Sequence, residues 1–117
     1  MGSVFWLVAA YLLGAIPWAY LIGKWTKGID IREYGSGNVG FTNALRIIGK
    51  GPAILVLIGD IGKGMLAVIL ARHFGSPVLA TLAGLSVVVG HNYPVFLGFR
   101  GGKGAAAGFG ALITLLP

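Results

Sequence analysis

The chain has 117 residues, of which 56% are hydrophobic and only 10% are charged, and its mean hydropathy is +0.88. A soluble domain of this size leaves much of its surface in water, and so few charged residues cannot cover that surface, so the composition excludes a soluble globule and indicates an integral membrane protein. The net charge of +6 does not by itself indicate nucleic-acid binding, and the absence of cysteine excludes disulfide and thiolate chemistry.

Four apolar segments are expected to enter the membrane as helices, over residues 3–23, 52–71, 76–97 and 105–117. The first carries no charge over about 31 Å of helix, one hydrocarbon thickness, and Pro17 is expected to kink it. The fourth falls short of the roughly 20 residues that a span needs. We therefore expect one all-α membrane domain over residues 1–117, with an incomplete fourth helix and a chain cut short at its C-terminal end. Small residues four apart, such as Ala106 and Gly110, are expected to let helices pack closely.

Most of the positive charge lies in two loops, residues 24–51 and 98–104. Cytoplasmic loops of membrane proteins carry an excess of Lys and Arg, whereas external loops do not. Both loops are therefore expected to face the cytoplasm, and the N-terminus is expected to lie outside.

The first loop contains a run of small residues that ends at Asn38, which is the expected N-cap of a short helix over residues 39–48. A glycine loop that opens into a helix N-terminus binds anions through free backbone N–H groups. Thr42 and Arg46 are four residues apart on one face of this helix, and Asn43 lies beside them. These features indicate an anion site; a solvated loop with Arg46 at the lipid headgroups is the alternative.

The second loop reads Phe-Arg-Gly-Gly-Lys-Gly over residues 99–104. Its glycines let backbone amides approach an oxyanion while Lys103 supplies charge, and a helix-connecting turn with interfacial cations is the alternative. His91 lies near the inner end of the third span, where ionisable groups are costly and usually functional; an interfacial histidine with a backbone partner is its alternative. Asp60 and Lys63 are three residues apart and are expected to pair on one helix face, bracing a site rather than catalysing.

These motifs occur in the same order in one family of bacterial membrane enzymes. The chain resembles the acyl-phosphate-dependent glycerol-3-phosphate acyltransferases over its whole length, which corresponds to the first three-fifths of a typical member. The segments that carry the resemblance are residues 11–17 (YLLGAIP), 35–46 (GSGNVGFTNALR), Asp60 with Lys63 and Gly64, 90–96 (GHNYPVF) and 99–104 (FRGGKG).

The resemblance implies a seven-helix enzyme of the bacterial inner membrane. Such an enzyme transfers a fatty acyl group from acyl phosphate to the 1-hydroxyl of sn-glycerol 3-phosphate, giving lysophosphatidic acid and phosphate for phospholipid synthesis. Its partners would be these two substrates and the membrane lipids, with no nucleic acid, no metal and no cofactor.

The motifs and the resemblance together predict which residues form the site. The predicted catalytic residues are Ser36, Arg46, Lys103 and His91. The predicted substrate- or phosphate-binding residues are Gly37, Asn38, Gly40, Thr42, Asn43, Gly101, Gly102 and Gly104, with Asp60 and Lys63 as the bracing pair.

Two alternatives to an active acyltransferase stay open. The family's third motif, a C-terminal cluster of His, Asn and Glu, is not found in the chain, and its absence leaves open an inactive fragment. A non-enzymatic four-helix transporter subunit would have a similar length. Such transporters use an acidic residue in the first span, and residues 3–23 contain none.

Overall fold

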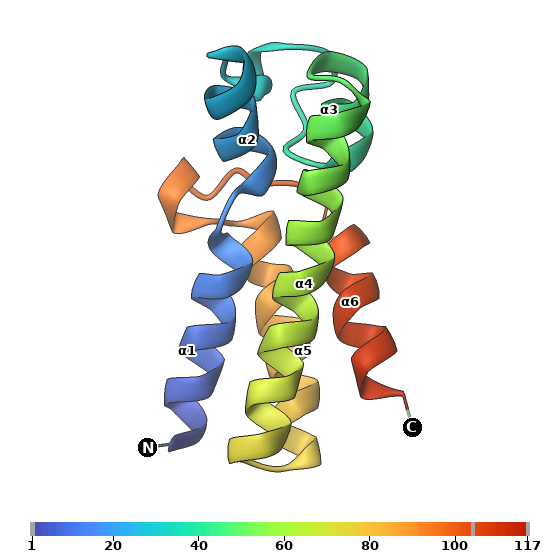
Figure 1. Ribbon diagram of the computed structural model, residues 1–117. Coiled ribbons are helices and arrows are strands. Elements are labelled where there is room, and N and C mark those ends of the chain that lie inside the picture. Colours follow the sequence, from blue (N-terminus) through green and yellow to red (C-terminus); the bar gives the residue numbers. More distant parts are fainter. Residues whose placement is uncertain (1, 104, 117) are drawn as a thin grey trace.

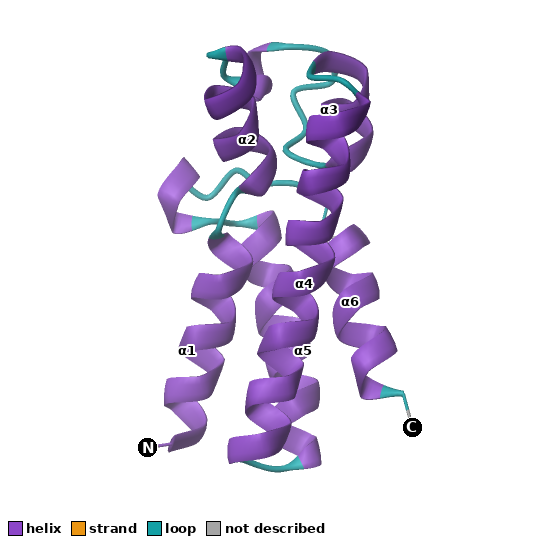
Figure 2. Ribbon diagram, in the orientation of Figure 1, coloured by secondary structure: helices purple, strands orange, loops and turns teal. Residues whose placement is uncertain are grey.

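The computed structural model describes residues 2–103 and 105–116, and its regular elements over those residues are all helices (Figures 1 and 2). In chain order they are α1 (Gly2–Ala15), α2 (Trp18–Lys27), the 3₁₀ turn η1 (Ile31–Glu33), α3 (Phe41–Ile47), α4 (Lys50–Phe74), α5 (Pro77–Asn92), the 3₁₀ turn η2 (Val95–Leu97) and α6 (Ala105–Leu115). Three stretches are long and apolar enough to cross a membrane, namely Gly2–Lys27, Lys50–Phe74 and Pro77–Leu97, and α6 is shorter. The expected all-α fold with three full apolar segments and a shorter fourth is confirmed.

Pro17 divides the first apolar segment into two helices, where the sequence predicted one kinked helix over residues 3–23. Helix α1 ends at Ala15 and α2 begins at Trp18, because proline has no N–H and its ring clashes with the preceding turn. Helix α2 continues to Lys27 and ends at Gly28, whose φ of 66° suits a residue without a Cβ. The break leaves the Ile16 carbonyl at a point where the regular helical hydrogen bonds are interrupted.

Proline also determines where the third apolar segment stops being helical. Helix α5 begins at Pro77, with the Ser76 hydroxyl accepting a hydrogen bond from the Leu79 N–H at 3.1 Å. The α-helix ends at Asn92, because the residue before a proline avoids the helical conformation and Pro94 follows Tyr93. The apolar stretch itself runs on through η2 to Leu97, in agreement with the predicted span over residues 76–97.

Helix α4 is the central element, since it contacts α1, α2, α3, α5 and α6. Its buried side chains belong to two apolar cores. Val68 and Ala71 pack with α1, α5 and α6 in one core, whereas Ala53 and Val56 pack with α2, α3 and the first loop in the other. Asp60 and Lys63 lie on α4 between the two cores, so the polar residues of this helix mark the junction between its two packing regions.

Glycines at two helix crossings allow very close packing. A Cβ at Gly64 of α4 would overlap the Ala107 carbonyl of α6, and a Cβ at Gly110 would overlap the Ile61 carbonyl in return. The α1–α5 crossing is built in the same reciprocal way, with Gly14 against Val87 and Gly90 against Tyr11. Backbones approach this closely only where both helices offer small residues, as membrane helices often do.

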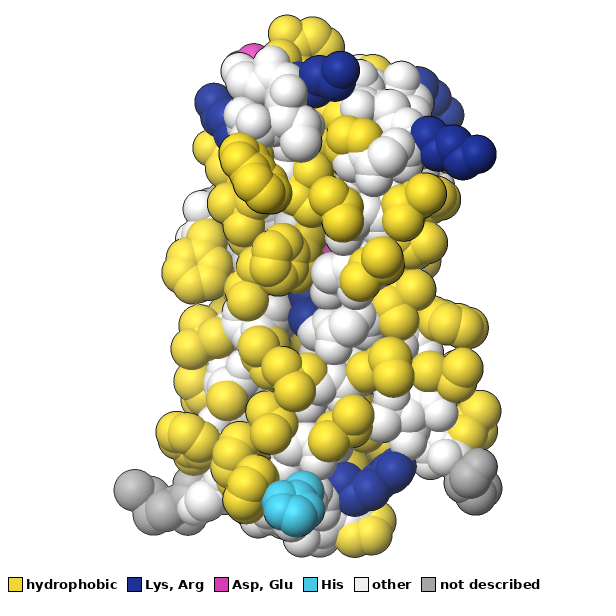
Figure 3. Space-filling model, in the orientation of Figure 1, with side chains coloured by type: hydrophobic (Ala, Val, Ile, Leu, Met, Phe, Trp, Pro, Cys, Tyr) yellow, Lys and Arg dark blue, Asp and Glu magenta, His cyan; other side chains and the backbone are white. Residues whose placement is uncertain are grey.

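The surface of the molecule is polarised from one end to the other. In Figure 3 hydrophobic side chains cover the middle of the molecule, and Lys and Arg gather at the end formed by α2 and α3. At the other end of α4, the exposed Arg72 and His73 lie beside Phe74, which stacks on Trp6 with ring centroids 5.1 Å apart. Basic residues and aromatic rings at the two ends of an apolar band are typical of a membrane protein.

Candidate functional site

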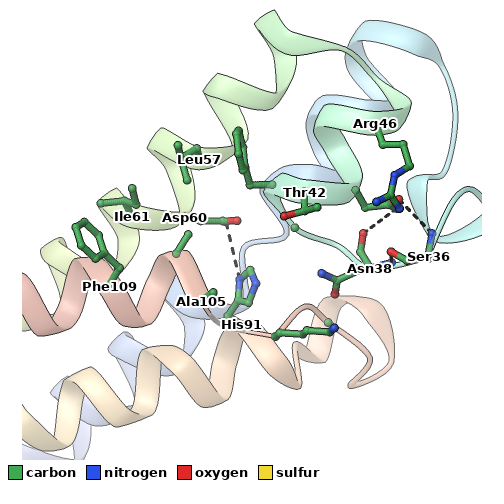
Figure 4. Close-up of a pocket in the computed structure, with 17 residues that line it drawn as sticks. Ser36, Asn38, Thr42, Arg46, Leu57, Asp60, Ile61, His91, Ala105 and Phe109 are labelled. Carbon is green, nitrogen blue, oxygen red and sulfur yellow. Dashed lines mark hydrogen bonds and ion pairs between the residues drawn. The ribbon is translucent and has the colours of Figure 1, made fainter.

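A pocket of about 850 Å³ lies between the two glycine loops and helices α3, α4 and α6 (Figure 4). Most residues predicted for the site line it, namely Ser36, Gly37, Asn38, Gly40, Thr42, Asn43, Arg46, Asp60, His91, Gly101 and Lys103. Gly102 and Lys63 lie outside the lining, and Gly104 lies outside the described residues. The fold therefore brings two loops that are about 60 residues apart in sequence to one cavity.

The first loop is folded on itself, and three of its backbone N–H groups already have partners. The Ser36 N–H donates to Asn43 Oδ1 at 3.2 Å, the Gly37 N–H donates to the Tyr34 carbonyl at 2.9 Å, and the Asn38 N–H donates to Ser36 Oγ at 3.2 Å. The expectation that this run offers free amides to an anion is therefore wrong for these three groups. What the loop presents to the pocket is chiefly polar side chains.

Asn43 organises this loop from the first turn of α3. Its side chain is fully buried, and its amide nitrogen donates to the carbonyls of Tyr34 and Asn38, each at 3.1 Å. Helix α3 begins at Phe41 with Gly40 as the residue before it and no side-chain cap, so Asn38 is not the N-cap that the sequence predicted. The local cause is that Asn38 uses its carbonyl to hold Asn43, which sets the start of the helix two residues later.

The exposed cations of the site are Arg46 and Lys103, which come from different segments. Thr42 and Arg46 both line the pocket from α3, as their four-residue spacing predicts, and both side chains are exposed. Lys103 lines it from the second loop and is also exposed. Two positive charges that reach one pocket from separate segments suit an anionic ligand with more than one charged oxygen.

An ion pair lies at the start of the first loop, shortly after the end of α2. The Arg32 guanidinium donates to both carboxylate oxygens of Asp30, at 2.9 Å and 2.7 Å, and lies 4.9 Å from the centre of the Tyr20 ring. The hydrogen bonds from Arg32 lower the pKa of the Asp30 carboxyl, and Asp30 in turn raises the pKa of Arg32. This pair stands beside the site, where it supports the loop that carries Ser36.

The second loop turns back onto the end of α5. The Gly101 N–H donates to the Asn92 carbonyl at 2.9 Å, and the Gly102 N–H donates to the His91 carbonyl at 3.1 Å. A Cβ at Gly101 would overlap the His91 carbonyl, and a Cβ at Gly102 would overlap the His91 ring at Nε2. The glycines are therefore needed for close packing against His91, and their amides are engaged rather than free for an oxyanion.

Three ionisable side chains form a buried cluster beside the pocket. Asp60, Lys63 and His91 are 1%, 4% and 6% exposed. Lys63 Nζ lies 3.2 Å from Asp60 Oδ1, which confirms the predicted pairing, and 2.6 Å from His91 Nδ1, a contact that the sequence did not predict. Figure 4 shows Asp60 and His91 pointing toward each other at the pocket wall, with Asp60 Oδ1 3.9 Å from His91 Nδ1.

The apolar part of the pocket was not predicted from the sequence. Leu57 and Ile61 of α4 line it together with Phe41, Ala105, Ala106 and Phe109. Leu57 and Ile61 are four residues apart and flank Asp60 on the same helix face, so helical spacing from Asp60 was a signal that could have identified them. The pocket thus combines a polar side formed by the loops with an apolar side formed by α4 and α6.

The chain is similar in sequence to members of one family. The family model "Glycerol-3-phosphate acyltransferase" matches residues 4–117. The glycerol-3-phosphate acyltransferase of Parasynechococcus marenigrum (strain WH8102) is 54% identical over 110 residues, which are 93% of this chain and 52% of the relative. Glycerol-3-phosphate acyltransferase 2 of Moorella thermoacetica is 52% identical over 111 residues, which are 95% of this chain and 57% of the relative.

Two crystal structures share the fold of the whole chain. Both are of PlsY (YgiH), an integral membrane glycerol 3-phosphate acyltransferase. Its glycerol 3-phosphate form has a TM-score of 0.93 and 41% identity, and this chain covers 59% of it; its lysophosphatidic acid form has a TM-score of 0.90 and 40% identity, with 58% covered.

The match extends over nearly all of this chain, although the chain spans only a little over half the length of the relatives named above. It includes both glycine loops and the buried pair on α4. None of these relatives is a transporter subunit, so the small-transporter interpretation has no support from them. On the family model, the identities and the shared fold, the chain belongs to the glycerol-3-phosphate acyltransferase family.

Proposed function

We propose that this chain provides the substrate-binding loops of an enzyme that transfers a fatty acyl group from acyl phosphate to the 1-hydroxyl of sn-glycerol 3-phosphate. The observation that carries the proposal is the single pocket in which both glycine loops meet, with Arg46 and Lys103 at its polar side. The family membership and the glycerol 3-phosphate and lysophosphatidic acid forms of the similar structures support the same substrate and product.

The shape of the pocket suits an amphiphilic donor. A long-chain acyl phosphate has a dianionic head and a hydrocarbon tail, and the pocket has cations on one side and Leu57, Ile61 and Phe109 on the other. Burying the tail against apolar side chains is favourable by about 25 cal/mol per Å². The phosphate head would then lie among the loop side chains, near Lys103 and Arg46.

The reaction needs little from the protein beyond orientation and charge. The hydroxyl oxygen of glycerol 3-phosphate attacks the carbonyl carbon of acyl phosphate, forming the ester C–O bond while the C–O bond to phosphate breaks. The hydroxyl proton passes to an oxygen of the departing phosphate, so a protein base is not required. Arg46 and Lys103 would stabilise the developing negative charge, and Ser36, Asn38 and Thr42 would orient the two phosphates.

The charge distribution supports a location in the bacterial plasma membrane with the loops in the cytoplasm. Lys24, Lys27, Lys50 and Arg46 lie at the end of the molecule that carries α2 and α3, and the positive-inside rule places such an end inside. Glycerol 3-phosphate is a soluble anion, so a cytoplasmic opening would give it direct access. Membrane lipids would then surround the apolar band.

A direct assay tests the proposed reaction. The purified chain in lipid vesicles receives palmitoyl phosphate and radiolabelled sn-glycerol 3-phosphate, and radiolabelled lysophosphatidic acid is measured. Product formation by this chain supports the proposal, whereas its absence supports the inactive-fragment alternative for the chain on its own. A chimera that appends the C-terminal part of the 54%-identical Parasynechococcus relative then tests the site itself.

Within that chimera, replacing Lys103 is the decisive change. Lys103→Ala is expected to lower turnover about 100-fold, because removing one charged group that stabilises a developing anion has an effect of this order. Lys27→Ala is the matched control, since Lys27 is an exposed lysine at the end of α2 and does not line the pocket. Turnover of Lys103→Ala equal to that of the control would contradict the role given to Lys103.

A further inference from the structure

The ammonium group of Lys63 has three close partners within the protein. Its Nζ donates to the Ile16 carbonyl at 3.0 Å and to His91 Nδ1 at 2.6 Å, and it forms an ion pair with Asp60 Oδ1 at 3.2 Å. An ammonium group can only donate hydrogen bonds, and two of the three contacts are hydrogen bonds, whereas the one with Asp60 Oδ1 is an ion pair. The three contacts join three separate parts of the chain, namely the break between α1 and α2, the helix α4 itself and the end of α5.

Burying a lysine at this position costs free energy, which argues that its side chain has a role beyond packing. Lys63 lies near the middle of α4 (Lys50–Phe74) and is 4% exposed, between two apolar cores. Charged groups within membrane segments are unfavourable unless they are paired, and an apolar side chain of similar volume often packs as well or better. A role in positioning a neighbouring group is therefore the better account of its presence.

The neighbouring group is the ring of His91. Because the Lys63 ammonium can only donate, His91 Nδ1 must accept, and the ring proton is then on Nε2. Nε2 lies beside Gly102, where a Cβ would overlap it, and His91 lines the pocket. The contact with Lys63 therefore leaves His91 with a single N–H, on the side of the ring that faces the second glycine loop.

His91 holds this loop with its backbone as well as with its ring. Its carbonyl accepts the Gly102 N–H at 3.1 Å, and Lys103 is the next residue along the chain. A change in the position or tautomer of His91 would thus alter the location of Gly102 and the direction from which Lys103 enters the pocket. A single residue, Gly102, therefore links the buried cluster to the exposed cation.

We infer that Lys63 is a positioning residue: through its hydrogen bond to His91 Nδ1 it fixes His91 as the Nε2–H tautomer, and so holds the second glycine loop in place for a phosphate-bearing ligand. His91 is accordingly a hydrogen-bond donor at the edge of the pocket rather than a general base. The identity of the ligand rests on the proposed function, whereas the tautomer and its dependence on Lys63 follow from the contacts within this chain alone.

The tautomer is measured by nitrogen NMR of the full chain in lipid bilayers. The chain contains two histidines, and His73→Gln, at the exposed end of α4, leaves His91 as the one histidine signal. With ¹⁵N-labelled histidine at neutral pH, we expect a protonated Nε2 and an unprotonated Nδ1. A protonated Nδ1 in this parent chain would overturn the inference without the need for any further variant.

Lys63→Met then removes the donor while keeping a long, flexible side chain. We expect the His91 signal to shift toward the Nδ1–H tautomer, and the dissociation constant for sn-glycerol 3-phosphate to rise at least tenfold. The matched control is Lys50→Met, which removes an exposed lysine from the same helix and should change neither quantity. An unchanged His91 spectrum in Lys63→Met would overturn the inference.

These measurements distinguish failure of the proposed function from failure of the positioning role of Lys63. If the expected tautomer and its dependence on Lys63 are seen but the chimera neither binds glycerol 3-phosphate nor forms lysophosphatidic acid, the proposed function fails and the role of Lys63 toward His91 stands. If lysophosphatidic acid is formed and the tautomer is Nδ1–H, the proposed function stands and the positioning role fails.

Discussion

Asn43, which the sequence predicts as a ligand-binding residue and which lines the pocket, also holds the first glycine loop in shape from a fully buried position. Asn43→Ala removes three hydrogen bonds, those with Ser36, Tyr34 and Asn38. Each hydrogen bond contributes about 0.5–1.5 kcal/mol, so the loop should open locally and the melting temperature should fall. Hydrogen exchange of the backbone amides of residues 34–40 measures the local effect directly.

The control for this variant is Leu45→Ala, which truncates an exposed side chain of the same short helix. Leu45→Ala should leave the exchange rates of residues 34–40 unchanged. If Asn43→Ala also leaves them unchanged, the loop does not depend on the Asn43 amide, and its shape must come from other contacts.

At the level of single residues, the sequence identifies the right segments but not how their atoms are used. Glycines and cations at 35–46 and 99–104 predict an anion site from residue type alone, and both segments line one pocket. The partners of the loop amides could not be predicted, because Tyr34, Asn43 and the end of α5 reach them only through turns that residue types do not determine. The contact between Lys63 and His91 joins two helices and is equally invisible in the sequence.

At the level of helices, the closest packing depends on single glycines. Gly64→Ala would place a methyl group against the Ala107 carbonyl and force α4 away from α6. Such overpacking costs about 1–3 kcal/mol, and the effect should appear as a lower melting temperature in detergent. The α4–α6 crossing also borders the pocket through Ile61 and Ala106, so the substrate affinity should fall as well.

Gly62→Ala on the same helix is the matched control, because nothing lies within 4 Å of a Cβ at that position. Alanine is favoured over glycine in a helix by about 1 kcal/mol, so Gly62→Ala should be neutral or stabilising. Equal melting temperatures for the two variants would show that the α4–α6 crossing tolerates separation.

The positions of the helices were predictable because long apolar stretches leave few alternatives in a membrane, where backbone groups must bond within the segment. The errors lie at Pro17 and at the short helix. Pro17 breaks the first apolar segment instead of only bending it. Helix α3 starts at Phe41 rather than 39, and the Asn43 amide in its first turn holds the Asn38 carbonyl instead of Asn38 capping the helix.

At the level of the whole molecule, three features follow the same axis. The cations gather at the end of α2 and α3 (Figures 1 and 3). The pocket is lined by the two glycine loops with α3, α4 and α6, and the buried cluster beside it lies between the two apolar cores. A soluble phosphate ester that enters from the basic end would meet the exposed cations first and the buried cluster last. The direction in which the chain crosses the membrane therefore decides which compartment supplies the substrate.

The orientation is testable with single cysteines, since the chain has none of its own. Lys50 and His73 are exposed residues near the two ends of α4, whose 25 residues extend about 37 Å, so labels at these sites report opposite faces of the bilayer. With the basic end in the cytoplasm, a membrane-impermeant maleimide should label His73→Cys in intact cells and Lys50→Cys only after the membrane is opened. The reverse labelling would place the pocket on the outer face, where cytoplasmic glycerol 3-phosphate could not reach it, and would contradict the proposed function together with the orientation.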